Sequence, residues 1–273
     1  MCETCGCGGD EATLHDEHEH VLPDGRVVRH AHHHGGAEHD HAPGAPTHAH
    51  RTESLEIAVL AKNDEAAARN RALFAERGLL AVNLMSSPGS GKTTVLEKIL
   101  VSLRRRDTPA FVLEGDQATS RDADRIQRTG VPVIQINTGK GCHLEAEMVA
   151  RGLGELKTEG GGLLFIENVG NLVCPALFDL GESARVVLFS VTEGEDKPLK
   201  YPHMFRAADL VLFTKTDLLP HLDFSLTEAK ENAAAVNPRA AQLELSARTG
   251  DGLDGLVSWL DARLASLRTG EMG

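Results

Sequence analysis

The sequence predicts an α/β fold: a mostly parallel sheet of about seven strands with helices on both faces, preceded by a disordered N-terminal tail rich in histidine. Short apolar runs rich in β-formers alternate with amphipathic stretches from residue 79 onward. An alternation of this kind gives a parallel sheet covered by helices, and about 195 residues are enough for one sizeable core. We therefore divide the chain into a tail (1–51), a lead-in helix (52–78) and an α/β domain (79–273).

The tail differs from the rest of the chain in its composition. Eleven of the 14 histidines lie within residues 1–51, where runs of large aliphatic residues are almost absent. Such a segment cannot bury enough apolar surface to offset the entropy that is lost on ordering. We expect it to be disordered when it holds no metal.

A lead-in helix is expected after the tail, because apolar residues recur at helical spacing from Glu53 to Arg77 without Pro or Gly, and Gly78 fits a helix stop. The apolar runs that we expect to form strands are Leu79–Met85, Ala110–Leu113, Val131–Ile136, Leu163–Ile166, Val186–Val191, Leu210–Phe213 and Gln242–Leu245. The main helices are expected between them, at Lys92–Arg106, Asp122–Gly130, Leu144–Lys157, Leu226–Val236 and Leu253–Leu267.

Composition excludes several classes of function. The net charge of −12 argues against nucleic acid or an anionic membrane as the main partner. Aromatic residues make up only 4%, too few for a base-stacking surface, and no apolar run approaches the ~20 residues of a membrane helix. No secretory signal is visible, and five cysteines do not fit a secreted disulfide framework. We expect a cytoplasmic protein whose cysteines are metal ligands or inert thiols.

A phosphate-binding loop is predicted at residues 86–93, which read Ser-Ser-Pro-Gly-Ser-Gly-Lys-Thr between a predicted strand and a predicted helix. In a P-loop, consecutive backbone N–H groups and the helix N-terminus bind phosphates. Lys92 would reach the β and γ phosphates, and Thr93 would bind Mg²⁺. The phosphate-binding residues that we predict are Gly89, Ser90, Gly91, Lys92, Thr93 and Thr94.

A P-loop site needs a second acidic group near the metal, and two candidates lie at strand ends. Asp116 follows the strand predicted around residues 110–113, and Glu167 follows the strand at 163–166. Glu167 would hold Mg²⁺ through water or orient the attacking water, while the Gly170 N–H would sense the γ-phosphate. The sequence leaves open which carboxylate is the direct ligand. The predicted catalytic residues are Lys92, Thr93, Asp116, Glu167 and Gly170, with Thr93 and Asp116 expected at Mg²⁺.

Two further loops predict that the base is guanine. The Thr214-Lys215-Thr216-Asp217 segment is similar to the Asn-Lys-x-Asp motif of GTPases. Asp217 would accept hydrogen bonds from guanine N1–H and N2–H₂, a donor pair that adenine lacks, and Lys215 would pack over the ring. Ser246 and Ala247 follow the next strand and resemble the loop whose backbone N–H contacts guanine O6. Thr214 stands where the motif has Asn, which predicts a weaker bracing contact.

Clustered thiols and imidazoles predict metal binding in the tail. Cys2, Cys5 and Cys7 place three thiols within six residues, which can converge on one soft or borderline metal. With the Met1 amine as fourth donor, the set would suit square-planar Ni(II). The histidines from His15 to His50 would bind Ni, Cu, Zn or Co with modest selectivity, as in metal storage.

A second candidate metal set lies inside the domain. Cys142 and His143 are adjacent, and Cys174 lies seven residues after Glu167, on the segment that should respond to nucleotide. Each chain supplies three ligands, which is an incomplete shell that a second chain around a two-fold axis could complete. Because Glu167, Gly170 and Cys174 share one segment, GTP binding and hydrolysis would shift a metal ligand.

Taken together, these motifs resemble the HypB family of hydrogenase nickel incorporation GTPases, which belong to the SIMIBI class of P-loop GTPases. The segments that carry the resemblance are MCETCGCGG, NLMSSPGSGKTTVLEK, NTGKGCHLEAEM, FIENVGNLVCPALFDLGE, EGEDKPLKYPHMF and TKTDLLP. The resemblance implies a nucleotide-controlled homodimer that cleaves GTP to GDP and phosphate. It also implies delivery of Ni(II) to the precursor of the large subunit of [NiFe]-hydrogenase, alongside the zinc-binding partner HypA.

The resemblance also assigns the two metal sets. It implies a tight nickel site at Cys2, Cys5 and Cys7, and a weaker site for Ni or Zn at Cys142, His143 and Cys174 in the dimer interface. The histidine tract is similar to that of family members that also store nickel. Three alternatives stay open: a nickel storage or detoxification protein, a urease-type nickel accessory GTPase, and an ATP-dependent small-molecule kinase.

Overall fold

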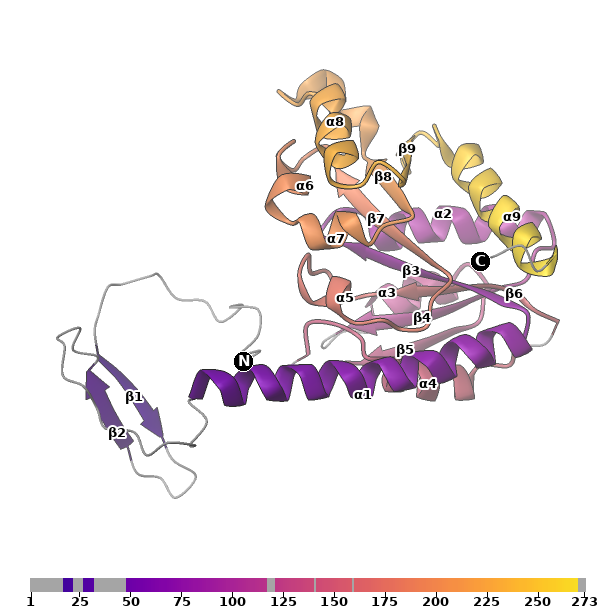
Figure 1. The fold of residues 1–273 in the computed structure, drawn as a ribbon. Helices are drawn as coiled ribbons and strands as arrows, with labels where there is room; N and C mark the ends of the chain where they lie inside the picture. Colours follow the sequence, from indigo (N-terminus) through magenta and orange to yellow (C-terminus); the bar gives the residue numbers. More distant parts are fainter. Residues whose placement is uncertain are drawn as a thin grey trace. The chain divides into compact units, whose positions relative to one another are not determined.

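The computed structural model describes residues 17–21, 27–31, 48–116, 121–139, 141–158 and 160–269, with side chains from residue 58 onward (Figure 1). These residues fall into two units, Met1–Glu56 and Ile57–Gly273. Strand β1 (Glu17–Val21) pairs antiparallel with β2 (Val27–Ala31) in the first unit. Both strands lie within residues 1–51, for which the sequence analysis predicted disorder and no strands. The remaining tail residues up to 47, including Cys2, Cys5 and Cys7, lie outside the described part of the chain.

The predicted lead-in helix is present as α1 (His48–Glu76), which begins four residues before the expected boundary at 52. The helix ends two residues before Gly78, whose φ of +62° lies in the left-handed region that glycine adopts without a steric penalty. Ala66, Ala67 and Phe74 are buried on one side of this helix. Small and large apolar residues at helical spacing therefore fix the face that packs on the domain.

All seven predicted strands form one parallel sheet. In chain order the strands are β3 (Leu79–Ser86), β4 (Ala110–Asp116), β5 (Val133–Asn137), β6 (Gly162–Glu167), β7 (Ala184–Ser190), β8 (Leu210–Thr214) and β9 (Ala241–Leu245). Their order across the sheet is β5-β4-β6-β3-β7-β8-β9, and every neighbouring pair is parallel. All eight residues of β3 are buried, as expected for a central strand covered on both faces.

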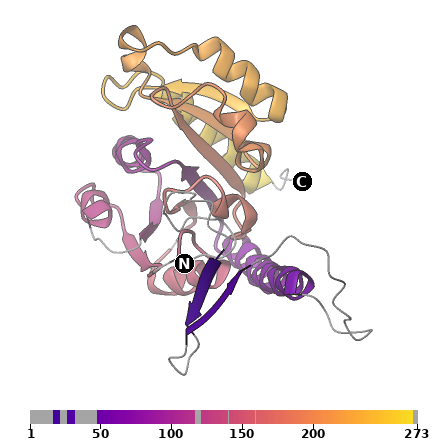
Figure 2. The same ribbon diagram turned by 90° about the vertical axis from the view of Figure 1, so that its left-hand side faces the viewer.

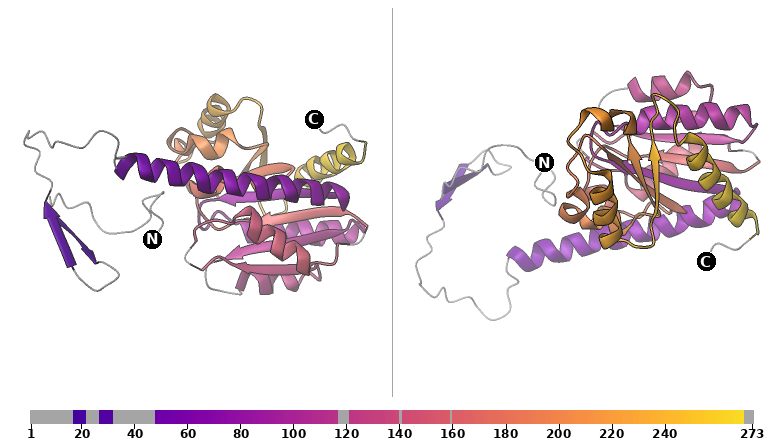
Figure 3. Two further views of the ribbon diagram at one scale, coloured as in Figure 1. Left: turned by 60° about the horizontal axis from the view of Figure 1, so that its bottom comes forward. Right: turned by 90° about the horizontal axis from the view of Figure 1, so that it is seen from above.

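Helices cover both faces of the sheet, as predicted (Figures 2 and 3). The five expected in the domain are α2 (Lys92–Arg105), α3 (Arg121–Gln127), α4 (Ala146–Glu155), α8 (Leu226–Val236) and α9 (Leu253–Thr269). The structure adds the single-turn elements α5 (Cys174–Leu177), α6 (Lys197–Lys200) and α7 (Pro202–Arg206), and a 3₁₀ helix at Thr216–His221. Among the described helices, none has the length and apolarity to cross a membrane.

Alternate residues of the central strands divide the core between the two faces. Leu80 and Val82 of β3 pack with helices α2 and α9, whereas Leu79 and Ala81 pack with α1 and α4. Met85, further along β3, belongs to a third apolar cluster with α7 and α8. Because all strands run the same way, the loops after β3, β4, β6, β8 and β9 meet at one edge of the sheet, where ligands bind in open α/β folds.

Candidate functional site

The predicted P-loop lies between the end of β3 and the start of α2, as the motif requires. Gly89 and Gly91 have φ values of +74° and +97°, so both positions use backbone conformations that favour glycine. The Lys92 ammonium donates a hydrogen bond to Ser86 Oγ at 2.9 Å. Burial lowers the pKa of Lys92, although the nearby Glu167 carboxylate opposes this shift. The lysine therefore sits where it can meet phosphate oxygens at the start of the helix.

Glu167, the last residue of β6, contacts the P-loop helix directly. The Thr93 hydroxyl donates to Glu167 Oε1 at 2.7 Å. Burial raises the pKa of Glu167 to about 7, with Lys92 and the Thr93 hydrogen bond acting in the opposite direction. Its other oxygen, Oε2, is buried without a hydrogen-bond partner within the described residues. Glu167 Oε2 can therefore accept a further hydrogen bond or bind a cation.

Glu114 is a residue of this site that the sequence analysis missed. It lies opposite Glu167 in the register of β4 and β6 and is only 2% exposed. Burial, and then the charge of Glu167, raise the pKa of Glu114 to about 8. Its Oε2 is also buried with no partner in the part of the chain that the structure describes. The signal in the sequence was a carboxylate directly after the apolar run Ala110–Leu113 and two residues before Asp116.

All five predicted catalytic residues border one cavity of about 500 Å³. They are Lys92, Thr93, Asp116, Glu167 and Gly170, and Glu114, Asp122 and Arg125 line the cavity with them. A Cβ on Gly170 would lie 3.0 Å from the Cα of Pro88, so glycine allows this segment to approach the P-loop closely. A hydroxyl and several carboxylates are the oxygen donors that Mg²⁺ prefers. The two unpartnered carboxylate oxygens support the fit of this cavity to a divalent cation.

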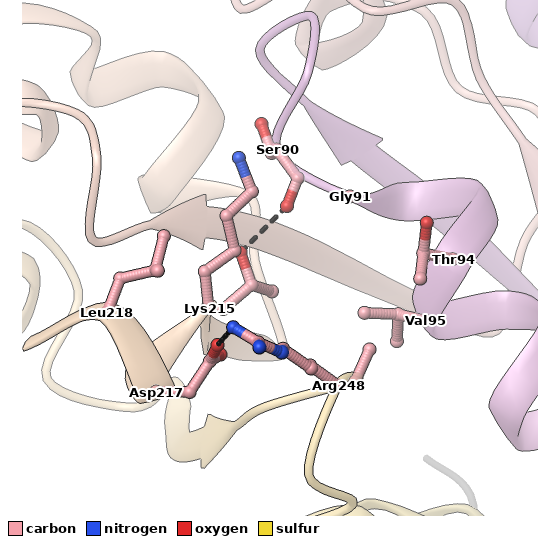
Figure 4. A pocket seen from close by; sticks show the side chains of 10 residues that line it. Ser90, Gly91, Thr94, Val95, Lys215, Asp217, Leu218 and Arg248 are labelled. Atoms are coloured by element: carbon pink, nitrogen blue, oxygen red, sulfur yellow. Dashed lines mark hydrogen bonds and ion pairs between the residues drawn. The ribbon is translucent and has the colours of Figure 1, made fainter.

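A second cavity of about 270 Å³ adjoins the P-loop, and three of the four predicted base-binding residues, Lys215, Asp217 and Ala247, line it (Figure 4). Asp217 Oδ1 accepts a hydrogen bond from the Ser246 hydroxyl at 2.6 Å, and its Oδ2 lies 3.9 Å from the Arg248 guanidinium. The carboxylate is therefore held in place in the lining of the cavity, where it can accept hydrogen bonds from N–H donors.

The loop after β8 is braced against the P-loop by two hydrogen bonds. The Lys215 ammonium donates to the carbonyl of Gly89 at 2.7 Å. The buried Thr214 hydroxyl donates to the carbonyl of Ser90 at 2.8 Å. We expected Thr214 to weaken the bracing contact of the motif, but the structure retains such a contact through its hydroxyl.

The three predicted metal-ligating residues of the domain converge. Cys142 Sγ lies 3.1 Å from Cys174 Sγ and 3.8 Å from His143 Nδ1, and the ligand atoms of all three residues lie within 4.8 Å of one another. The His143 ring stacks on Phe178 with centroids 3.9 Å apart. Burial lowers the pKa of His143, which favours the neutral imidazole that binds metals. Two thiols and an imidazole suit Zn or Ni and leave room for a fourth donor.

A buried amide joins the metal-ligating segment to the phosphate cavity. Asn168, which follows Glu167 and is 1% exposed, accepts a hydrogen bond from the backbone N–H of Leu144 at 3.1 Å. The same Oδ1 accepts from the Val169 N–H at 3.0 Å. Leu144 directly follows His143, so one side chain connects the residue next to the cavity carboxylate with the residue next to a metal ligand. No local sequence pattern indicated this contact between residues 24 positions apart.

The comparisons with known proteins agree with this geometry. Residues 80–244 match the family model described as CobW/HypB/UreG, nucleotide-binding domain. The chain is 48% identical over 281 residues to the hydrogenase maturation factor HypB of Azotobacter vinelandii, covering 96% of this chain and 92% of that protein. It is 46% identical over 290 residues to HypB of Escherichia coli strain K12, covering 96% and 99%.

A solved structure extends the likeness to three dimensions. The crystal structure of HypB from Helicobacter pylori in complex with nickel matches with a TM-score of 0.72 and 41% identity. The match covers 78% of this chain and 98% of that one. The parallel sheet, the P-loop and the sequence relatives lead to the same assignment, and the chain belongs to the HypB family of hydrogenase maturation factors.

Proposed function

We propose that this protein is a GTP-hydrolysing nickel metallochaperone that inserts Ni(II) into the large subunit of [NiFe]-hydrogenase. The observation that carries the proposal is the position of the cysteine–histidine cluster. Cys174 lies seven residues after Glu167, so the segment that borders the phosphate cavity also carries a ligand of the cluster. The names of the relatives, hydrogenase maturation factors, support the same role.

Binding and cleavage of GTP are assigned to the cavity at the P-loop. Lys92 and the loop N–H groups bind the phosphates, and the Gly170 N–H meets the γ-phosphate. Thr93 and Asp116 would hold Mg²⁺, which neutralises phosphate charge when it is bound. Glu167 keeps the Thr93 hydroxyl oriented through its 2.7 Å hydrogen bond, so that the Thr93 oxygen lone pairs stay available. Hydrolysis by one chain alone is slow, because fast GTP cleavage depends on an arginine that stabilises the negative charge of the transition state.

Guanine selection is assigned to the loops after β8 and β9. Asp217 accepts the N1–H and N2–H₂ groups, Lys215 covers the ring, and the backbone N–H of Ala247 donates to O6. The hydrogen bond from Ser246 fixes the carboxylate before the base arrives. An adenine ring lacks the N–H pair that this carboxylate would accept from guanine, which favours GTP over ATP.

Nickel is the cargo of Cys142, His143 and Cys174. Three donors from one chain leave the shell open, so a homodimer that brings two clusters together completes it. An open shell also gives a route for the ion to leave. Zn(II) would fit the same donors, since thiolate and imidazole bind both metals.

Nucleotide and metal binding are coupled through one segment. A γ-phosphate that draws in Gly170 moves the chain on which Asn168 and Cys174 lie. Asn168 is hydrogen-bonded to the Leu144 N–H, so displacement of the segment also reaches the neighbour of His143. By linkage, a metal that prefers one nucleotide state makes that nucleotide prefer the metal-bound state by the same factor.

The remaining partners follow from the family role. The zinc-binding protein HypA and the precursor of the hydrogenase large subunit are the protein partners, in the cytoplasm, with no nucleic acid or membrane partner. Cys2, Cys5 and Cys7 form a tight nickel site, and the histidine tract stores nickel. The eleven histidines of residues 1–51 favour primary nickel storage as the second candidate function.

Two variants test the proposal. Lys92→Ala should abolish GTP cleavage by the purified chain and leave hydrogenase without nickel in cells. Deletion of residues 1–51 should leave hydrogenase activity intact when nickel is plentiful. A deletion variant that loses all function at high nickel, with Lys92→Ala active, would instead establish the storage role.

A further inference from the structure

Helix α1 presents two buried asparagines, Asn63 and Asn70, to the two segments that carry the metal ligands. These metal-ligating segments are residues 142–146 and residues 174–180. They lie seven residues apart, which places them on the same face of the helix. Their exposed fractions are 7% and 2%. Buried amides of this kind need hydrogen-bond partners, and all the partners of these two belong to the metal-ligating segments.

Asn63 connects the two segments directly. Its Oδ1 accepts a hydrogen bond from the backbone N–H of Ala146 at 2.9 Å, and its Nδ2 donates to the carbonyl of Asp179 at 2.7 Å. Ala146 lies three residues after His143, and Asp179 lies five residues after Cys174. One side chain of α1 therefore bridges the backbones that carry the imidazole and one of the thiols.

Asn70 repeats the bridge two turns further along the helix. Its Nδ2 donates to the carbonyl of Ala146 at 2.8 Å and to the carbonyl of Leu180 at 3.0 Å. The N–H and the C=O of Ala146 are thus both bonded to α1. Together the side chains of the two asparagines make four hydrogen bonds to the backbones of the metal-ligating segments.

The backbone around these contacts is adapted to a close approach of the helix. Ala66 and Ala67 of α1 form a small buried cluster with Ala146. Gly181 has a φ of +85°, and a Cβ there would lie 2.5 Å from the carbonyl oxygen of Ala67. Only glycine allows the second segment to lie this close to the helix. The contact is therefore built into the fold at several residues.

We propose that Asn63 and Asn70 are positioning residues for the metal site, and that α1 braces Cys142, His143 and Cys174 in a geometry that can hold a transition metal. The inference rests on the proposed function, in which these three residues bind the ion. The ligands come from two segments that are far apart in the chain, so their convergence depends on what ties those segments together. Groups that orient metal ligands from outside the coordination shell set metal affinity in the same way.

The test uses Co(II) as the probe metal with the full-length chain in a Cys2→Ser, Cys5→Ser, Cys7→Ser background. Thiolate-to-cobalt charge-transfer absorption then reports Cys142 and Cys174 alone, because the tail histidines give no such band. Asn63→Ala and Asn70→Ala should each weaken Co(II) binding by roughly 10-fold. GDP affinity, measured in parallel, should stay within about twofold of the parent, because neither residue lines the nucleotide cavities.

Arg77, which directly follows α1, provides a matched control. The Arg77 guanidinium bonds to the Leu153 carbonyl at 3.3 Å and to the Thr158 hydroxyl at 3.2 Å, and so joins the end of α1 to the end of α4 away from the cluster. Arg77→Ala should lower thermal stability and leave the Co(II) affinity unchanged. Equal loss of Co(II) binding in Arg77→Ala and in the asparagine variants would show a general effect of stability and would overturn the brace.

A milder substitution keeps the inference testable if an alanine variant does not fold. Asn63→Asp retains the acceptor for the Ala146 N–H and loses the donor to Asp179, so it should weaken Co(II) binding less than Asn63→Ala does. Parent-like Co(II) affinity in Asn63→Asp and Asn70→Ala, with normal GDP binding, would overturn the proposal. A parent chain that binds GDP but gives no charge-transfer band would overturn the proposed metal site, and the brace with it.

Discussion

The Thr93 hydroxyl donates a hydrogen bond to Glu167 Oε1 at 2.7 Å, and this contact joins the start of α2 to the end of β6. A hydroxyl that gives its proton to Glu167 keeps its oxygen lone pairs for a cation. We therefore propose that Glu167 Oε1 acts through Thr93, and that Asp116 is the direct carboxylate ligand of Mg²⁺. The sequence had left these two carboxylates equivalent.

Substitution of Glu167 should impair hydrolysis more than nucleotide binding. Glu167→Gln keeps an acceptor for Thr93 but removes the charge that would hold Mg²⁺ through water or orient the attacking water, so we expect GTP cleavage to fall by about 100-fold. GDP affinity should change by less than about threefold, because the P-loop and the base pocket remain intact. Single-turnover cleavage and equilibrium GDP binding measure the two effects. An unchanged cleavage rate would remove Glu167 from the mechanism.

The stability of the nucleotide-free protein should fall as the pH rises. Burial raises the pKa of Glu114 from its ordinary value of 4.5 to about 8 and that of Glu167 to about 7. Between the ordinary pKa of 4.5 and the raised pKa values of about 7 and about 8, the folded chain binds more protons than the unfolded chain. The free energy of unfolding therefore decreases as the pH rises through this range. Urea unfolding from about pH 5 to about pH 9 measures this slope.

Glu114→Gln provides the control for this pH dependence. The amide cannot ionise, so the slope should become shallower, while the wild type with Mg²⁺ and GDP should regain stability at high pH. A stability that rises through the same range in the wild type would contradict the assignment of these buried carboxyl groups.

Asp217 should determine which base is bound. Asp217→Asn replaces one acceptor by an amide donor, so GDP affinity should fall by roughly 100-fold, in line with the loss of a charge-assisted pair of hydrogen bonds. The same amide complements the carbonyl that xanthine carries in place of the guanine amino group, so xanthosine diphosphate should bind better than GDP. Competition between GDP and xanthosine diphosphate for the variant measures this change of preference. Retained preference for GDP would place guanine recognition elsewhere.

Asn168 should transmit the nucleotide state to the metal ligands. Asn168→Ala removes its hydrogen bonds to Leu144 and Val169, so the Ni(II) affinities measured with GDP and with a non-hydrolysable GTP analogue should become nearly equal. GTP cleavage should persist, because the carboxylate of Glu167 remains. A variant that keeps the wild-type ratio of the two affinities would show that the coupling runs by another route.

The sequence predicted the elements that have strong local patterns. All seven strands of the sheet and the five expected domain helices lie within a few residues of the expected ranges, because apolar periodicity and the P-loop motif extend over many residues. The single-turn helix α5 was missed, since four residues with a proline at the start carry no periodicity. Strands β1 and β2 were missed because composition alone argued for disorder in the tail.

Residues that act through distant contacts could not be found in the sequence. The convergence of Cys142, His143 and Cys174 was expected from their residue types, but the supports of the cluster were not. Asn70 contacts residues 76 and 110 positions away, and no local pattern marks such pairs. Glu114 directly follows the strand predicted at Ala110–Leu113, and only the register with β6 shows that it lies opposite a second carboxylate.

The most direct test of the account is the Ni(II) affinity of the Cys142 cluster in two nucleotide states. It is measured in the chain lacking the three tail cysteines, once with GDP and once with a non-hydrolysable GTP analogue. Charge-transfer absorption from the Cys142 and Cys174 thiolates to nickel separates this site from the tail histidines. We expect affinities that differ by about 5- to 150-fold, the usual range of coupling between two sites. Equal affinities in the two states would contradict the proposed coupling of nucleotide binding to nickel binding.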